Sequence, residues 1–182
     1  MIISHRKKFI FIHNYKVAGT SIRKSLELYD YNTINNSTYL DKLKLFLGIS
    51  PKVCSSQFEG HITAVELKDK IPHKIFNDYY KFGFVRNPWD WQVSLYKYML
   101  KLESHPQHTL IKSMKNFDEY IDWRVHEDLH LQKDFFYENN VCLMDFIGRF
   151  KNLKQGFGKV CKKIDIKVDL PHLNKSRKDN DF

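Results

Sequence analysis

Two short runs of aromatic and β-branched residues, each followed directly by a loop and a helix-forming segment, constrain the fold of this chain most strongly. The first run is Phe9–His13 and the second is Tyr80–Val85. Runs of this length and composition are typical of buried strands. Because strands that alternate with helices form parallel sheets with helices on their faces, the sequence predicts an α/β fold.

The same signals predict the other elements. Helices are expected at residues 20–28, 39–47, 62–71, 88–102, 117–126 and 152–163, and a third strand at residues 141–147. Pro88 suits the first turn of its helix, and Asn116 can cap the next one. Residues 31–38 and 105–109 are expected to be loops. With 182 residues and no repeat or linker-like stretch, the chain is expected to form one domain over residues 1–182.

Composition narrows the class of protein. Hydrophobic residues make up 42% of the chain, enough for a core, yet no apolar run reaches the length of a membrane-spanning helix. The first residues lack the order of a secretory signal. Cys54, Cys142 and Cys161 are odd in number and widely spaced. Neither a disulfide framework nor a cysteine zinc site is therefore expected, and a reducing, cytoplasmic compartment is the simplest setting.

The chain is also basic, with 30 Lys and Arg residues against 21 Asp and Glu residues and a formal net charge of +9. This balance favours a polyanionic partner such as nucleic acid, anionic lipid or a phosphate-rich small molecule, although a generally basic surface explains it equally well. Most of the aromatic residues occupy core-like strand positions, so nucleic acid is not the expected partner.

The loop after the first strand carries residues suited to an anion. Lys16, Gly19, Thr20 and Ser21 lie where the strand turns into a helix. A glycine allows close backbone approach, the helix start presents N–H groups, and lysine adds a mobile positive charge. The loop is not a Walker A motif, because its lysine precedes its single glycine. An ordinary strand-to-helix turn is the alternative explanation.

The loop after the second strand carries a second candidate. Arg86 follows that strand directly, where a guanidinium group can bind a phosphate through two hydrogen bonds. Ser94 lies about two helical turns further on and can donate from the same side. The alternative is an Arg86–Asp90 ion pair at the start of a helix.

Taken together, the Lys-x-Ala-Gly-Thr-Ser loop and the Arg-Asn-Pro-Trp-Asp-x-x-x-Ser-x-Tyr segment resemble the sulfotransferase superfamily. The closest likeness is to its carbohydrate-type branch, which uses 3′-phosphoadenosine 5′-phosphosulfate (PAPS). Three more segments extend the resemblance in the family's order: residues 60–64, 145–153 and 170–176. The fold that this resemblance implies is a P-loop NTPase-like three-layer sandwich, with a central parallel sheet flanked by helices.

The resemblance also implies roles for individual residues. The 5′-phosphosulfate group of PAPS would be bound by Lys16, Ala18, Gly19, Thr20 and Ser21, the 3′-phosphate by Arg86 and Ser94, and the nucleotide would be covered by a late loop of Lys175, Ser176 and Arg177. The sequence departs from the family pattern at Val17, where threonine is usual, and at Trp91, where arginine is frequent.

His61 is the candidate general base. A neutral imidazole can accept a proton at pH 7, and the Gly60-His61 pair resembles the catalytic histidine segment of glycan 2-O-type sulfotransferases. Lys16 would stabilise the departing phosphate. The acceptor implied is a hydroxyl group of a carbohydrate or glycoconjugate, and no metal is required. The alternative for His61 is a helix cap or a surface residue.

Three other functions compete with this interpretation. His126-Glu127-Asp128-Leu129-His130 matches the zinc-protease helix pattern, but Lys133 and Phe136 replace the residues that extend it in metzincins. A P-loop kinase or nucleotide hydrolase would need a Walker lysine and a magnesium carboxylate, and neither is evident. A non-catalytic module that binds an anionic polymer through a decayed cofactor site remains open.

Overall fold

The computed structural model of the protein describes residues 1–30 and 53–171, and its centre is a four-stranded sheet. The strands are β1 (Ile2–Ser4), β2 (Phe9–Phe11), β3 (Tyr80–Val85) and β6 (Phe146–Arg149), in the order β1-β2-β3-β6. Strands β2, β3 and β6 are parallel, whereas β1 pairs antiparallel with β2 at one edge. The expected α/β fold with a mainly parallel sheet is confirmed, with an antiparallel edge strand added.

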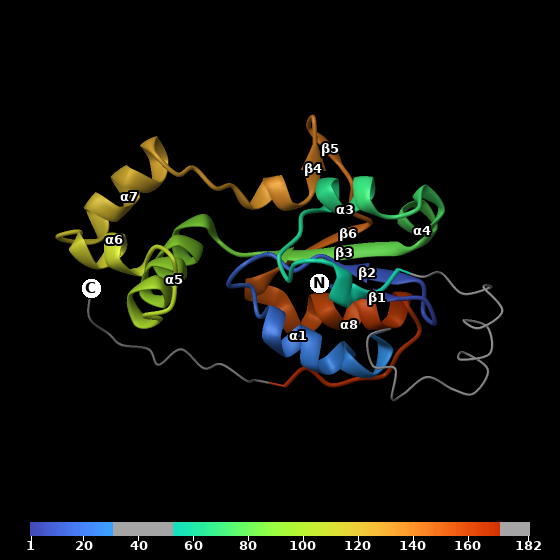
Figure 1. Ribbon diagram of the computed structural model, residues 1–182. Helices are drawn as coiled ribbons and strands as arrows, with labels where there is room; N and C mark the ends of the chain where they lie inside the picture. The colour runs from blue at the N-terminus through green and yellow to red at the C-terminus, as the bar shows by residue number, and fades with distance from the viewer. Residues whose placement is uncertain (31–52, 172–182) are drawn as a thin grey trace.

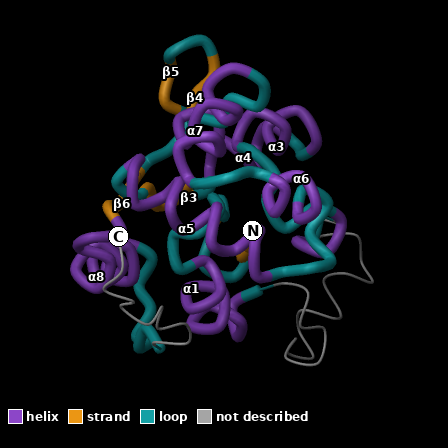
Figure 2. Tube along the Cα trace, turned by 90° about the vertical axis from the view of Figure 1, so that its left-hand side faces the viewer, coloured by secondary structure: helices purple, strands orange, loops and turns teal. Residues whose placement is uncertain are grey.

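Helices cover both faces of this sheet (Figures 1 and 2). On one face lie α1 (Gly19–Leu26) and α8 (Leu153–Lys163). On the other lie α3 (Ala64–Lys70), α4 (His73–Asp78) and a hairpin of β4 (Tyr137–Glu138) and β5 (Val141–Cys142). A third group of helices stands beyond the end of the sheet and comprises α5 (Pro88–Lys101), α6 (His108–Ser113) and α7 (Phe117–His126). Among the described residues, 3₁₀ turns connect these elements at η1 (Glu27–Tyr29), η3 (Ser55–Gln57), η4 (Gln132–Phe135) and η5 (Phe150–Asn152).

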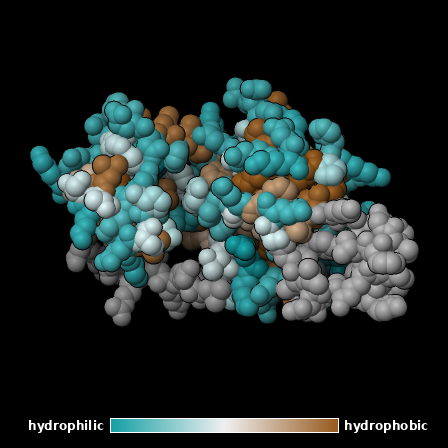
Figure 3. Space-filling view, viewed as in Figure 1, coloured by the Kyte–Doolittle hydropathy of each residue, from teal (hydrophilic) through white to brown (hydrophobic). Residues whose placement is uncertain are grey.

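The two faces of the sheet bury separate hydrophobic clusters because side chains alternate along each strand. Phe9 and Phe11 of β2 pack on the α1 and α8 side, whereas Ile10 packs on the α3 and α4 side. A third cluster joins α5, α6 and α7 through Met99, Ile111 and Tyr120. On the face seen in Figure 3, the surface is mainly hydrophilic, and hydrophobic side chains gather over the sheet beside α3 and α4. Within the described ranges, no helix is long and apolar enough to cross a bilayer.

Strand β3 and helix α7 coincide with their expected ranges, and α5 ends one residue short of its expected end. The expected strand at 141–147 was wrong, because this stretch is divided between hairpin strand β5 and sheet strand β6. Asn139 and Asn140 have φ values of 47° and 65°, which form a tight turn and pair β5 with β4. The Asp145 carboxylate then accepts the backbone N–H of Lys81 at 2.7 Å, just before β6 begins.

Three short elements were not expected. Strand β1 and helices α4 and α6 have three to six residues each, too few for a clear hydrophobic period. Helix α6 overlaps the expected loop at 105–109, which was therefore wrong at its end. The expected helix at 39–47 lies outside the described residues.

Candidate active site

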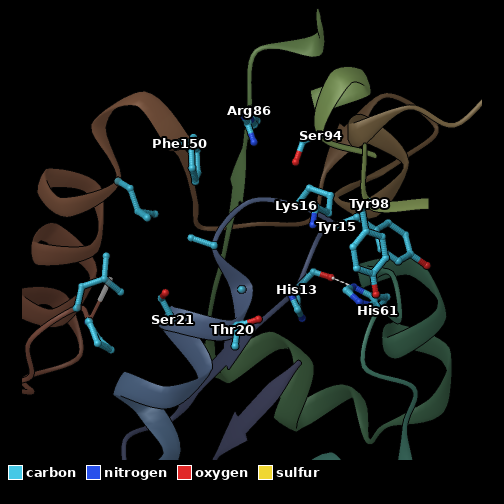
Figure 4. Close-up of a pocket in the computed structure, with 15 residues that line it drawn as sticks. His13, Tyr15, Lys16, Thr20, Ser21, His61, Arg86, Ser94, Tyr98 and Phe150 are labelled. Atoms are coloured by element: carbon cyan, nitrogen blue, oxygen red, sulfur yellow. Dashed lines mark hydrogen bonds between the residues drawn. The ribbon is translucent and has the colours of Figure 1, made fainter. Parts of the chain in front are cut away.

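A pocket of about 300 Å³ opens where the parallel strands end, and both predicted anion-binding loops line it (Figure 4). The loop after β2, the residue after β3 and the turn after β6 supply Lys16, Arg86 and Phe150, respectively. Ligands of parallel α/β sheets bind at this edge because the strand-to-helix loops gather there. The predicted residues that line the pocket are Lys16, Ala18, Gly19, Thr20, Ser21, His61, Arg86 and Ser94. The predicted Lys175, Ser176 and Arg177 lie outside the described residues.

The first loop lines the pocket and has an unusual backbone conformation. Lys16 and Ala18 have left-handed φ values of 56° and 62°. Alternation of right- and left-handed residues turns successive N–H groups toward one point, which favours an anion. Ala18 is the N-cap of α1, so the positive end of the helix lies at the same place. Gly19 is required by space, since a Cβ there would lie 1.5 Å from Nε2 of His13.

The two departures from the family pattern both anchor this loop. Val17 is fully buried in the core between β2 and α1. Trp91 of α5 is 2% exposed, and its Nε1–H donates to the carbonyl oxygen of Tyr15 at 2.8 Å. Neither side chain is free to contact a phosphate. They hold the loop backbone that precedes and follows Lys16.

Lys16 extends toward helix α5 and lies over an aromatic ring. Its Nζ is 4.1 Å from the centre of the Tyr98 ring, a cation–π contact. Burial and the nearby charge of Arg86 lower the pKa of Lys16. The charge of Arg86 thus disfavours the protonated form of Lys16, and an anion bound beside both side chains would offset that repulsion. Within the described part of the chain, Lys16 forms no ion pair with a carboxylate.

Arg86 leaves the end of β3 and lies against Phe150 from η5, with its guanidinium carbon 4.8 Å from the ring centre. Its buried Nε has no hydrogen-bond partner among the described residues. Burial lowers the pKa of Arg86, and the charge of Asp90 opposes that shift. The described residues contain no Arg86–Asp90 ion pair, so the alternative of a simple helix-start pair is wrong. Arg86 therefore retains hydrogen-bonding capacity for a ligand.

His61 lies on the opposite side of the pocket from Arg86 (Figure 4). Its Nδ1–H donates to the carbonyl oxygen of His13 at 2.9 Å, which leaves the lone pair of the neutral ring on Nε2. The ring stacks on Tyr15 at a centroid distance of 4.0 Å. Burial lowers the pKa of His61, against the opposing effect of its hydrogen bond to His13. The imidazole is therefore neutral at pH 7.

His61 does not cap a helix. Helix α3 begins at Ala64, and its cap is Thr63, whose side chain accepts the backbone N–H of Glu66. Glu66 in turn accepts the backbone N–H of Thr63 at 2.8 Å, which completes a capping box. The helix start is thus two residues later than the position expected from the sequence. His61 occupies the turn before it and faces the pocket.

The zinc-protease pattern does not form a metal site. Helix α7 ends at His126, so His130 does not lie one turn further along the same helix. Asp128 is instead bound by Arg124 at 2.5 Å and by the amide of Gln107 at 2.9 Å. No group of three or more metal-ligating side chains occurs within residues 1–30 and 53–171.

Several pocket residues were not singled out from the sequence. Tyr15, Tyr98 and Phe150 line the pocket and contact its charged or basic side chains. Phe150 follows β6 directly and Tyr15 lies in the loop after β2, and a position after a strand was an available signal. Tyr98 lies one helical turn after Ser94, on the same side of α5. Its contact with Lys16 depends on tertiary packing, which cannot be predicted from the local sequence around either residue.

Comparison with known proteins identifies the family of the chain. A family model described as "Sulfotransferase family" matches residues 1–182. An uncharacterised protein of Archaeoglobus fulgidus is 28% identical over 123 residues, which are 63% of this chain and 92% of that protein. No solved structure gives a significant match. Since the family model covers the whole sequence, the chain belongs to the sulfotransferase family.

Proposed function

We propose that this protein transfers a sulfuryl group from PAPS to a hydroxyl group of a carbohydrate or glycoconjugate. The observation that carries the proposal is that Lys16 and Arg86, from two separate loops, line one pocket of about 300 Å³ together with His61. A pocket of this size accommodates a small ligand, and its cations suit one with more than one anionic group. We also propose that residues 1–182 form one domain of the P-loop NTPase-like three-layer type.

The residues present fit the donor. Lys16 and the start of α1 would hold the 5′-phosphosulfate, and the left-handed loop presents N–H groups for it. Arg86 and Ser94 would hold the 3′-phosphate, for which the buried Arg86 Nε has an unused hydrogen. Phe150 offers an apolar surface beside Arg86 for a nucleotide base. Lys175, Ser176 and Arg177 are proposed to complete the site.

PAPS supplies an activated sulfuryl group, whose bond to the phosphate oxygen breaks as the acceptor oxygen bonds to sulfur. The Nε2 lone pair of His61 would accept the proton of the acceptor hydroxyl, because Nδ1 is engaged with the His13 carbonyl. Lys16 would neutralise the charge that develops on the departing phosphate. The proposal is supported by the position of both residues in the lining of one pocket.

The carbohydrate acceptor is supported by the aromatic side chains beside His61. Tyr15 and Tyr98 are 39% and 41% exposed, and both line the pocket. Exposed aromatic faces offer apolar surface to the C–H groups of a sugar ring, while their hydroxyl groups can bond to its polar groups. The acceptor would thus enter past Tyr15 and Tyr98 and present one hydroxyl to His61.

The test is a comparison of nucleotides, followed by an assay of transfer. Adenosine 3′,5′-bisphosphate should raise the melting temperature, whereas ATP with Mg²⁺ should have a smaller effect. Labelled sulfate from PAPS should then appear on at least one member of a panel of glycans. Preference for ATP with Mg²⁺ would point to a kinase or hydrolase. Salt-sensitive binding of heparin without any nucleotide effect would point to a non-catalytic polymer-binding module.

A further inference from the structure

Gln132 forms hydrogen bonds to both anion-binding loops through one side-chain amide. Its Oε1 accepts the backbone N–H of Arg86 at 2.8 Å, and its Nε2 donates to the backbone carbonyl of Arg86 at 2.8 Å. The same Oε1 accepts the side-chain N–H of Asn14 at 3.2 Å. Asn14 directly precedes Tyr15 and Lys16 and is fully buried. One amide thus contacts the end of β3 and the residue that opens the Lys16 loop.

The contact with Arg86 takes the form of a strand pairing. Residue Val85 is the last of β3, and its ladder partner is Arg149 of β6. At the next residue, the amide of Gln132 offers one donor and one acceptor to the N–H and C=O of Arg86, as a neighbouring strand would. These two hydrogen bonds continue the strand-like backbone of β3 by one residue. They thereby fix the direction in which the Arg86 side chain leaves the backbone.

Gln132 arrives from a different part of the fold. It begins η4, after the segment that follows α7, and it is only partly buried. Its backbone neighbours Leu131 and Lys133 are exposed, whereas Phe135 of the same turn packs in the core. The polar contacts of Gln132 therefore do not serve to fill the core. They connect the loops that carry Lys16 and Arg86.

We propose that Gln132 is a positioning residue that sets the spacing between the Lys16 loop and the Arg86 guanidinium, and thereby the pocket's discrimination between ligands with one and two phosphate groups. The proposal rests on the proposed function for the identity of the nucleotide. A bisphosphate engages both loops at once, so its affinity depends on their spacing. A monophosphate engages the Lys16 loop alone and is less sensitive to that spacing.

The test compares Gln132→Met with wild type, using adenosine 3′,5′-bisphosphate and adenosine 5′-phosphate in titration calorimetry. Methionine keeps the length of the side chain and removes all three hydrogen bonds. We expect affinity for the bisphosphate to fall about tenfold or more and affinity for the monophosphate to fall much less, so that the ratio of the two shrinks. Gln155→Met on the exposed face of α8 is the matched control and should leave the ratio unchanged. An unchanged ratio in Gln132→Met, or equal weakening of both ligands, overturns the proposal.

A second measurement needs no nucleotide. Hydrogen exchange of the Arg86 backbone amide in the free protein should be about tenfold faster in Gln132→Met and unchanged in Gln155→Met. If wild type binds neither nucleotide, the proposed function fails, and this exchange rate alone decides whether Gln132 holds Arg86. If the methionine variant does not fold, Gln132→Asn keeps an uncharged amide but shortens the side chain by one methylene group, which weakens its hydrogen bonds to Arg86 and Asn14. The bisphosphate-to-monophosphate ratio should shrink there too, and an unchanged ratio overturns the proposal.

Discussion

The Nζ of Lys16 lies 4.1 Å from the centre of the Tyr98 ring, which joins the loop after β2 to helix α5. The same helix carries Ser94 one turn earlier, and both residues line the pocket. The aromatic ring therefore restricts the lysine on the side of the pocket where Ser94 also points.

This contact predicts a difference between two substitutions of Tyr98. Tyr98→Leu removes the cation–π contact, worth about 0.5–2 kcal/mol, and should weaken binding of adenosine 3′,5′-bisphosphate several-fold. Tyr98→Phe keeps the ring and should bind like wild type. Titration calorimetry measures both. Equal affinities for the leucine and phenylalanine variants would contradict a role of the ring in holding Lys16.

Replacement of His61 should separate catalysis from binding. In His61→Gln, the side chain can no longer accept the acceptor proton, so turnover of sulfuryl transfer should fall about 10²- to 10⁴-fold. Affinity for adenosine 3′,5′-bisphosphate should stay within about twofold of wild type, because His61 lies across the pocket from Arg86. His126→Gln, on an exposed histidine of α7, serves as the control. Unchanged turnover in His61→Gln would remove His61 from the reaction.

The pH dependence of turnover should follow the same residue. Burial lowers the pKa of His61 from its ordinary value of 6.5. The base is active when unprotonated, so the rate should rise with pH, reach half of its maximum below pH 6.5 and become level at higher pH. Values of kcat/KM from pH 4.5 to 8 test this, because they report ionisation of the free enzyme. A midpoint clearly above 6.5 would be inconsistent with a buried neutral base.

Gly19→Ala should damage the fold, whereas Gly158→Ala should not. A Cβ at Gly19 would lie 1.5 Å from Nε2 of His13, and the histidine is itself buried. A Cβ at Gly158 of α8 would meet nothing within 4 Å, so alanine there should add about 0.5–1 kcal/mol of stability through helix propensity. Thermal melting of both variants provides the comparison. A Gly19→Ala protein that melts with wild type would show that His13 can move aside.

The stability of the fold should fall in acid because of His13. Burial, with smaller contributions from neighbouring charges that include His61, lowers the pKa of His13 to about 3. The unfolded chain therefore binds this proton more readily, and the stabilisation is complete above about pH 6.5 and is lost as the pH falls toward 3. Each such proton contributes a slope of about 1.4 kcal/mol per pH unit. His13→Gln should flatten the decline of the free energy of unfolding between pH 6 and 4. Parallel declines in wild type and variant would contradict this account.

The elements that could be predicted from the sequence are those with strong local signals. Pro88 stands at the first position of α5, and Asn87 before it accepts the N–H groups of Trp89 and Asp90. Asn116 caps α7 through the N–H of Glu119. The apolar run at 141–147 misled because hydrophobicity alone does not reveal the left-handed turn at Asn139 and Asn140, which draws Val141 into a hairpin.

The residues of the candidate site were likewise predictable only where a local signal marks them. Lys16, Arg86 and Ser94 were predictable because they stand in loops after strands or on the helix that follows, where parallel sheets bind ligands. The pocket brings these three residues together. The contacts of Tyr98 and Gln132 could not be predicted, since each joins segments that are distant in the chain. Such contacts arise only when the sheet and its helices are packed.

The left-handed backbone at Lys16 and Ala18 flanks a valine that is sealed in the core. Left-handed geometry costs about 1–2 kcal/mol for a residue other than glycine, so the surrounding packing must hold this loop in place. The loop consequently has its binding conformation before an anion arrives, so that little conformational entropy is lost on binding. Affinity for an anion at this site therefore depends on how well the core packs around Val17. Substitutions of core residues that pack against Val17, although they do not line the pocket, should lower its affinity for anions.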